Sequence, residues 1–271
     1  MKSVIAAIPL EKLLEQLPEN YMVADRELVV RAYHMAEEAH REQKRHSGEP
    51  YINHCIAVAS ILSDLKVPAE VVAAGLLHDT VEDTPVSLAD IRREFGDTVK
   101  LLVDGVTKLT QLPRVSRGDQ HAEAGENGND SEEFENQSAF GRNPDMVSET
   151  LRKTFLAMGE DVRVVLIKLS DRLHNMRTLG HMPEHKRKRI AQETLDIFAP
   201  LANRLGIWQL KWELEDLSFR YVNPEKYKEI AEQLAERRPD RENQLEEIKD
   251  NLVRLLEKNN IKSEISGRPK H

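Results

Sequence analysis

Residues 71–84, "VVAAGLLHDTVEDT", join an apolar run directly to a histidine and three carboxylates. The run of valine, alanine, glycine and leucine is typical of a buried helix. On a continuous helix, residues four apart share a face, so His78 stands over Glu82. The same spacing sets Asp79 over Asp83. The stretch therefore predicts a core helix that carries two stacked polar pairs, and buried groups of this kind need a partner.

The rest of the chain has the composition and periodicity of a helical protein. Its 271 residues can enclose a sizeable core, and 32% of them are charged while only 5% are aromatic. Asp25, Pro50 and Pro68 mark helix starts, and Gly96 marks a stop. Helical spacing of apolar residues runs through 25–43, 51–65, 69–79, 87–96, 148–159, 161–179, 185–206 and 224–258. We predict an all-α fold with little strand.

Charge and cysteine content narrow the functional classes. The formal net charge of −8 and the pI near 5.8 argue against a general affinity for nucleic acid or anionic membranes. Cys55 is the only cysteine, which rules out an intrachain disulfide and favours a reducing, cytoplasmic setting. Pro9 and Glu11 interrupt the short apolar start of the chain, and no long apolar run follows. We therefore expect neither an export signal nor a membrane span.

Two segments depart from the helical pattern. Residues 119–145 hold eight acidic residues and one arginine, with no aliphatic side chain larger than alanine. Such a segment cannot bury enough surface to offset the entropy of ordering, so we expect a disordered insertion, with an acidic regulatory loop as the alternative. Residues 261–271, "IKSEISGRPKH", alternate apolar and polar side chains and then turn at a glycine. They predict the first strand of a further domain.

The segment "LIKLSDRLHNMRTLGHM" carries a stripe of leucine and methionine at helical spacing. Asp171, Asn175 and Thr178 form an adjoining stripe at spacings of four and three. One interpretation is an exposed polar face with ion pairs to Arg172 and Arg177. The other is a carboxylate that packs inward, and a buried carboxylate is costly without a partner. A divalent cation is one such partner.

A further candidate ligand is His54, in the apolar segment "YINHCIAVA". By itself this residue fits an ordinary core histidine, but two imidazoles and two carboxylates occur on three predicted helices. The set has no thiolate, which suits a six-coordinate ion such as Mn²⁺ or Fe²⁺ better than a structural zinc ion. The candidate metal ligands are His54, His78, Asp79 and Asp171. Glu82 and Asp83, one helical turn beyond the ligands, are then placed to move protons.

The histidine, histidine–aspartate and aspartate pattern on helices resembles that of the HD-domain metal-dependent phosphohydrolases. More narrowly, the chain resembles the Rel/SpoT family of bifunctional enzymes that act on guanosine tetraphosphate and pentaphosphate, (p)ppGpp. The blocks that carry this resemblance are "KRHSGEPYINHC", "AAGLLHDTVEDT", "DGVTKL", "KLSDRLHNMRTL", "FAPLANRLGIWQLKWELEDLSFRY" and "GRPKH". They occur in this order through almost the whole chain, interrupted by the acidic segment.

The resemblance implies the hydrolase half of a stringent-response enzyme. The family's hydrolase uses Mn²⁺ to remove the 3′-diphosphate of (p)ppGpp, which leaves GDP or GTP and pyrophosphate. By this resemblance the four candidate ligands hold the Mn²⁺, and Glu82 and Asp83 are the paired catalytic acids. Residues 1–200 would form the helical hydrolase domain, and residues 201–271 a helical connector and the truncated start of an α/β synthetase domain. Synthetase-only members lack the histidine–aspartate signature, so its presence predicts a working hydrolase, and we expect no synthetase activity here.

The resemblance also assigns the nucleotide pocket. It implies that the planar Arg45 guanidinium stacks on the guanine base, with an ordinary surface charge as the alternative. The further pocket residues that it implies are Ser47, Tyr51, Asn175 and Thr178. Two positions depart from the family's pattern, because His46 replaces a usual basic residue and Cys55 replaces a usual proline. The contact made by that basic residue is therefore not carried over.

Two other functions share some of these features. Another HD-type enzyme, acting on deoxynucleoside triphosphates, nucleoside monophosphates or cyclic nucleotides, would have the same metal site, and product analysis distinguishes it. A nucleotide-sensing helical module with a vestigial site would bind metal without turnover. For the (p)ppGpp hydrolase, the expected partners are guanine nucleotides and, in cis, the synthetase and regulatory regions of longer family members.

Overall fold

The computed structural model describes residues 9–111, 161–235 and 238–259, together with positions 261, 263 and 265–267. The acidic segment 119–145 and the expected helix over 148–159 lie outside these residues. Every regular element in the described part is a helix, as predicted. None of these helices is both long enough and apolar enough to cross a membrane. The chain divides into two compact units, Met1–Ser218 and Phe219–His271.

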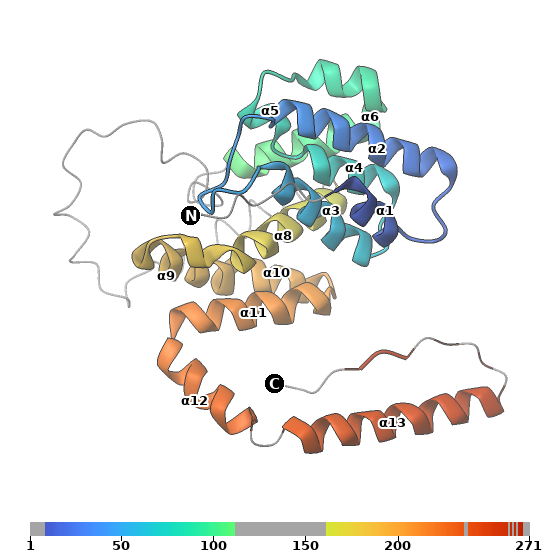
Figure 1. Cartoon of the computed structure of the whole chain (residues 1–271), viewed down its shortest axis with the longest axis vertical. Coiled ribbons are helices and arrows are strands. Elements are labelled where there is room, and N and C mark those ends of the chain that lie inside the picture. Colours follow the sequence, from blue (N-terminus) through green and yellow to red (C-terminus); the bar gives the residue numbers. More distant parts are fainter. Residues whose placement is uncertain are drawn as a thin grey trace. The chain divides into compact units, whose positions relative to one another are not determined.

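The first unit is built around α4 (Ala69–Leu77), which contains the apolar run that precedes the histidine and carboxylates. All residues of α4 except Glu70 are buried. The helices that pack around it are α2 (Val23–Ala39), α3 (Ile52–Asp64), α6 (Leu88–Gln111) and α8 (Val162–Arg177) (Figure 1). Gly75 allows α3 to approach closely, because a Cβ atom there would collide with the Leu62 side chain. A helix that is apolar on all sides must be enclosed by others, so α4 forms the centre of the core.

Glycines shape α6 and its contact with α8. Gly96 has a φ of +83°, a left-handed conformation that glycine adopts readily, and it interrupts α6 where the sequence predicted a helix stop. The helix then resumes and continues to Gln111. At Gly105, an added Cβ atom would lie 2.7 Å from the Val164 side chain. The absence of a side chain at this position allows the close contact with α8, the helix that carries Asp171.

The predicted helix starts are close to those observed. Asp25, the predicted cap of α2, is instead its third residue, and its Oδ2 accepts the N–H of Met22 at 2.9 Å. Pro68 directly precedes α4, as predicted. Asp161 caps α8, where its Oδ1 accepts the N–H of Arg163 at 2.9 Å. These side-chain acceptors satisfy N–H groups that the first turn of a helix leaves without partners.

The first unit contains further helical elements. They are α1 (Leu10–Gln16), α5 (Thr80–Asp83), the 3₁₀ turn η1 (Leu179–His181), α9 (Glu184–Glu193), η2 (Thr194–Phe198), α10 (Ala199–Arg204) and α11 (Trp208–Val222), which continues into the second unit. The π-helical η2 interrupts the regular helix predicted over 185–206. Buried Arg172 contacts this segment, because its Nε donates to Thr194 Oγ1 at 2.9 Å and its guanidinium lies 4.3 Å from the Phe198 ring centroid.

The second unit contains two helices where the sequence predicted one. The single helix predicted over 224–258 is wrong, because α12 (Pro224–Ala235) and α13 (Arg238–Lys258) are separate. Pro239 lies in the first turn of α13 and lacks the N–H that would bond to a preceding helix, so a new helix begins there. Ile248 and Leu255 on α13 are more than half exposed.

The strand predicted over 261–271 is absent at the positions that the structure describes. Ile261, Ser263 and residues 265–267 have no regular secondary structure. A strand is stable only when its backbone pairs with another strand, and the described part of the chain contains no such partner. The other positions of this segment lie outside the described residues.

Candidate active site

Three helices bring the candidate metal ligands together in the core of the first unit. Their residues are His54 on α3, His78 and Asp79 at the end of α4, and Asp171 on α8, all of them buried. The tightest set is His54, His78 and Asp171, whose ligand atoms lie within 4.8 Å of one another. His54 Nε2 lies 3.3 Å from His78 Nε2 and 3.4 Å from Asp171 Oδ1. Two imidazole nitrogens and a carboxylate oxygen therefore converge, which matches the ligands of a divalent cation.

Asp79 joins these three residues from the junction between α4 and α5. The four candidate ligands together are called the metal cluster below. Its Oδ2 lies 3.0 Å from His78 Nε2 and 3.5 Å from His54 Nε2. The same oxygen accepts the Tyr51 hydroxyl at 2.7 Å. The continuous helix predicted through this stretch is wrong, because α4 ends before His78 and α5 begins after Asp79. Both side chains at this break contact groups of α3 or α8.

The imidazoles and carboxylates of the metal cluster shift one another's pKa values. Burial by itself lowers the pKa of His78, but the charges of Asp79 and Asp171 outweigh burial and raise that pKa to about 9. Burial also opposes ionisation of the two carboxyls, but His78 beside Asp79 and Lys168 beside Asp171 hold both pKa values well below their usual range. Positive charge is therefore favoured at the centre of the cluster, and a divalent cation would compete with a proton there.

Two side chains of α8 hold the Asp171 carboxylate. Lys168 Nζ, which is buried, donates to Asp171 Oδ2 at 2.9 Å. Asn175 Nδ2 donates to Asp171 Oδ1 at 2.7 Å. Lys168 was not among the site residues predicted from the sequence, although its position three residues before Asp171 is a spacing at which helical side chains meet. These bonds leave Asp171 ionised and fixed in orientation.

The structure contradicts the alternative in which Asp171 belongs to an exposed polar face with ion pairs to neighbouring arginines. Arg172 instead pairs with Glu193, with 2.7 Å between Nη2 and Oε2. Arg177 pairs with Glu213 of α11, with 2.6 Å between Nε and Oε1. Asp171 is 4% exposed, so its carboxylate faces inward.

Glu82 and Asp83 lie on α5, directly after the ligand pair. Glu82 is half-buried, and its Oε1 has no hydrogen-bond partner among the described residues. Burial and the nearby Asp79 carboxylate raise the pKa of Glu82 to about 7. The Asp83 N–H donates to the Asp79 carbonyl at 3.0 Å, and the Asp83 carbonyl accepts the Gln43 side chain at 2.7 Å. At this pKa, Glu82 can give or take a proton near neutral pH.

Arg45 joins the predicted nucleotide residues into one group. Its Nη2 donates to Asn175 Oδ1 at 2.7 Å and to Thr178 Oγ1 at 3.4 Å. Its Cζ lies 5.8 Å from the centroid of the Tyr51 ring. Arg45 is therefore tied to α8 and is no ordinary surface charge. Because Asn175 also donates to Asp171, this nucleotide group is continuous with the metal cluster.

A tight turn presents Arg45 to α8. The Gly48 N–H donates to the Arg45 carbonyl at 2.8 Å, and the Arg45 N–H donates to the Glu49 carbonyl at 2.9 Å. Gly48 has a φ of +85°, which favours glycine at this point of the turn. Ser47 lies in the same turn, but its hydroxyl donates to Glu49 Oε1 at 2.9 Å. The structure thus brings together the predicted nucleotide residues except Ser47, which bonds within the turn.

Two histidines outside the predicted set also contact the site. His174 Nδ1 lies 2.7 Å from His54 Nδ1. Burial, and after it the electrostatic effect of nearby His54, lower the pKa of His174 to about 2. His40 stacks on the Tyr51 ring with 4.6 Å between ring centroids. The spacing of His174 from Asp171 on α8 could have suggested the first, whereas the His40 contact has no signal in the local sequence.

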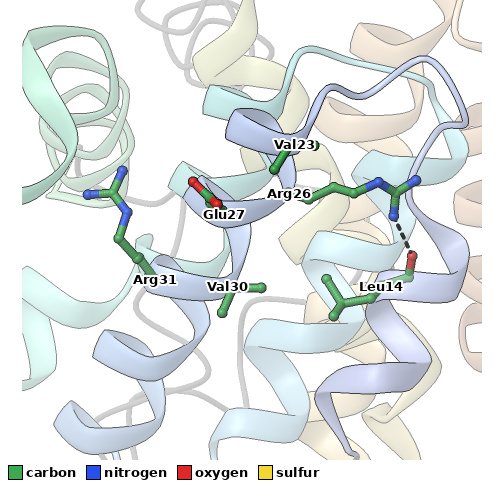
Figure 2. A pocket seen from close by; sticks show the side chains of 6 residues that line it. All are labelled: Leu14, Val23, Arg26, Glu27, Val30 and Arg31. Carbon is green, nitrogen blue, oxygen red and sulfur yellow. Dashed lines mark hydrogen bonds between the residues drawn. The ribbon is translucent and has the colours of Figure 1, made fainter.

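A separate hollow on α1 and α2 plays no part in this site (Figure 2). Its lining residues are Leu14, Val23, Arg26, Glu27, Val30 and Arg31. Arg26 closes one side by donating to the Leu14 carbonyl at 3.1 Å. None of the predicted site residues lines this hollow.

Comparison with known proteins agrees with the architecture of the site. A family model described as HD domain matches residues 32–208. A probable guanosine-3′,5′-bis(diphosphate) 3′-pyrophosphohydrolase of a Synechocystis species is 47% identical over 245 residues, which cover 90% of this chain and 29% of that protein. A GTP pyrophosphokinase of Streptomyces coelicolor is 46% identical over 243 residues, which cover 90% of this chain and 25% of that protein. These names agree with the Rel/SpoT resemblance.

A solved structure also resembles this chain. It is described as a metazoan orthologue of SpoT that hydrolyses ppGpp, and it matches 75% of this chain and 98% of its own, with a TM-score of 0.51 and 26% identity. The chain spans less than a third of the length of the two curated relatives. The matched residues 32–208 include every predicted metal ligand, catalytic acid and nucleotide residue. By this match, the chain belongs to the HD-domain family.

Proposed function

We propose that this chain hydrolyses the 3′-diphosphate of (p)ppGpp to GDP or GTP and pyrophosphate, with Mn²⁺ as cofactor, in stringent-response control. The observation that carries the proposal is that Asn175 connects the two groups. It accepts from Arg45 of the nucleotide group and donates to Asp171 of the metal cluster. The relatives support it, because the Synechocystis protein is named for this reaction and the metazoan SpoT orthologue is described as hydrolysing ppGpp.

The metal cluster fits a divalent cation of intermediate hardness. It offers two imidazole nitrogens and two carboxylates, is buried, and contains no thiolate. In this proposal the residues that hold Mn²⁺ are His54, His78, Asp79 and Asp171. When bound, the ion supplies Lewis-acid polarisation of a phosphoryl oxygen and lowers the pKa of a nearby water. The His78 Nδ1–H donates to the Gly75 carbonyl at 2.8 Å, which leaves the Nε2 lone pair for the ion.

Glu82 and Asp83 move the protons of the reaction. Attack of water on the first phosphorus of the 3′-diphosphate breaks its bond to the ribose 3′ oxygen. The water must lose a proton, and the departing 3′ oxygen must gain one. Glu82 has a pKa of about 7, so it is suited to take the first proton at neutral pH. Asp83, its neighbour on α5, is the second carboxyl available for the transfer to the ribose oxygen.

The nucleotide group binds the guanosine. The planar Arg45 guanidinium covers one face of the guanine base, as arginine does on other flat rings. Asn175 and Thr178, which accept from Arg45, hold the guanidinium in orientation. Tyr51 supports the same cation with its ring and holds Asp79 with its hydroxyl. Ser47 belongs to the group through the turn that carries Arg45.

The domain assignment and the partners follow from this function. We assign residues 1–200 to the hydrolase and residues 201–271 to a helical connector and the start of a synthetase domain in a longer cytoplasmic protein. The first compact unit extends somewhat further, to Ser218, and so includes most residues of α11. Relatives named GTP pyrophosphokinase are several times longer than the matched part, which supports synthetase and regulatory regions as partners in cis.

Product analysis tests the proposal. Purified protein with Mn²⁺ should convert ppGpp to GDP and pyrophosphate, chelation should stop the reaction, and added Mn²⁺ should restore it. The His78→Ala variant controls for contaminating hydrolases. Release of single orthophosphates, or faster turnover of deoxynucleoside triphosphates or cyclic nucleotides, would indicate a different HD-type enzyme. Mn²⁺ binding with no turnover of any nucleotide would indicate a sensing module.

A further inference from the structure

The two candidate histidine ligands differ in what contacts their second ring nitrogen. His78 Nδ1 lies 2.8 Å from the Gly75 carbonyl oxygen, one turn back in its own helix. His54 Nδ1 lies 2.7 Å from His174 Nδ1, on another helix. The first partner is backbone and cannot be changed by substitution, whereas the second is a side chain. The orientation of His54 therefore depends on the identity of residue 174.

The partner of Nδ1 decides which tautomer a histidine adopts. A carbonyl oxygen can only accept, so a neutral His78 carries its proton on Nδ1 and keeps a lone pair on Nε2. An imidazole nitrogen can either donate or accept. If His174 donated, a neutral His54 would carry its proton on Nε2, the nitrogen that lies 3.4 Å from Asp171 Oδ1. A metal ion could not bind that protonated nitrogen.

The structure assigns a role to His174 that rests on the proposed metal site. We propose that His174 is a positioning residue, which accepts the proton of His54 Nδ1–H and thereby keeps the Nε2 lone pair of His54 directed at the cation. His174 is not itself a ligand in this proposal, because it contacts the nitrogen of His54 that faces away from the metal cluster. Partners of this kind fix the tautomer and the ring orientation of metal-binding histidines.

The position of His174 on α8 explains why one contact has two effects. The residue lies three positions after Asp171, so one turn of α8 supplies both a ligand and the group that orients a second ligand on α3. The bond between His54 and His174 also holds α3 against α8 beside the metal cluster. Loss of the acceptor should thus weaken metal binding without removing a ligand.

Substitutions at position 174 separate hydrogen bonding from packing. In His174→Asn, the amide Oδ1 takes the place of Nδ1 and can still accept from His54. In His174→Leu and His174→Ala, no acceptor is present, and leucine retains apolar bulk. His34→Ala is the matched control, since the His34 side chain is 61% exposed and lies on α2. Mn²⁺ affinity is measured by calorimetric titration of the metal-free proteins, and folding by circular dichroism and thermal melting.

We expect His174→Leu and His174→Ala to weaken Mn²⁺ binding by about tenfold to a hundredfold, the usual effect of losing such a partner. His174→Asn should stay close to the wild-type affinity, and His34→Ala should match it. Equal affinity in the wild type and in a folded leucine or alanine variant would overturn the role of His174 and leave the proposed metal site standing. Equal losses in the asparagine and leucine variants would overturn the hydrogen-bond explanation. Absence of Mn²⁺ binding by the wild type would overturn the metal site and this inference with it.

Discussion

The metal cluster and the nucleotide group are joined through Asn175, yet their surroundings differ. The residues of the metal cluster are buried at the contact of α3, α4 and α8, and protein groups hold each of them. The nucleotide group centres on Arg45, which is half-buried and lies on a turn. The metal cluster thus holds its charged side chains on packed helices, whereas the nucleotide group holds the Arg45 guanidinium on a short turn.

This difference separates two requirements of a metal-dependent hydrolase. Ligand atoms must be held to within a fraction of an ångström, which packed helices achieve better than loops. A base-binding side chain must instead admit and release its ligand, which a turn residue near solvent allows. Changes in the metal cluster should therefore abolish both metal binding and catalysis, whereas changes in the nucleotide group should weaken nucleotide binding and leave the metal in place.

The largest effect is expected for Asp171→Ala. This change should abolish Mn²⁺ binding and hydrolysis, and it should lower the free energy of unfolding of the metal-free protein by about 3–5 kcal/mol. The physical reason is that buried Lys168 loses the carboxylate at 2.9 Å. Urea unfolding and Mn²⁺ titration measure the two effects.

A double variant distinguishes the stability effect from the metal effect. Replacing both partners, as Lys168→Met with Asp171→Leu, leaves no unpaired charge and should recover most of the lost stability. Mn²⁺ binding should remain absent. Recovery of Mn²⁺ binding in the double variant would remove Asp171 from the set of ligands.

Glu82→Gln should reduce turnover while leaving the metal cluster intact. We expect the rate to fall by about 10²- to 10⁴-fold, the usual contribution of a proton-transfer group. Mn²⁺ affinity should change little, because Glu82 lies on α5, outside the four ligands. The matched control is Glu27→Gln, an exposed glutamate on α2. A near-normal rate in Glu82→Gln would exclude Glu82 as the proton-transfer group.

Arg45→Ala should have a smaller and more selective effect. Loss of the stacked guanidinium should weaken ppGpp binding by about tenfold to a hundredfold, the range measured for stacking on a base. Mn²⁺ affinity should remain unchanged, which would confirm that the two regions are separable. Lys44→Ala, at the exposed neighbouring position, is the control. If Arg45→Lys binds ppGpp as tightly as the wild type, charge alone and not stacking explains the role of Arg45.

The smallest effect concerns stability and pH in the metal-free protein. Folding raises the pKa of Glu82 from 4.5 to about 7, so the folded state disfavours its ionised form. The stability that the neutral acid provides is therefore present below pH 4.5 and is lost as the pH rises towards 7. Glu82→Gln should stabilise the protein at pH 8 by roughly 1 kcal/mol, a value reduced for partial exposure of the side chain, and by less at about pH 4.5. Urea unfolding at both pH values measures this difference, and an equal gain at the two pH values would contradict the linkage.

The structure confirms those predictions that depend only on residues close together in the sequence, such as the apolar pattern of a helix. The apolar run of α4 predicts a central helix because a helix without a polar face must be enclosed on all sides. Two of the errors in helix boundaries lie at places where the periodicity gives no sign of a break. One is the break at His78 and Asp79, and the other is Pro239, which separates α12 from α13. The predicted strand failed at its described positions because a strand depends on a distant partner.

Composition and periodicity along the chain predicted a helical protein with histidines and carboxylates of the types that bind a divalent cation. Both follow from side-chain chemistry and from periodicity along the chain. The folded molecule shows what the sequence left open: Asp171 faces inward, His54 bonds to His174, and Arg45 reaches α8. Each of these facts depends on the packing of helices around α4, which sets distances between residues far apart in the sequence.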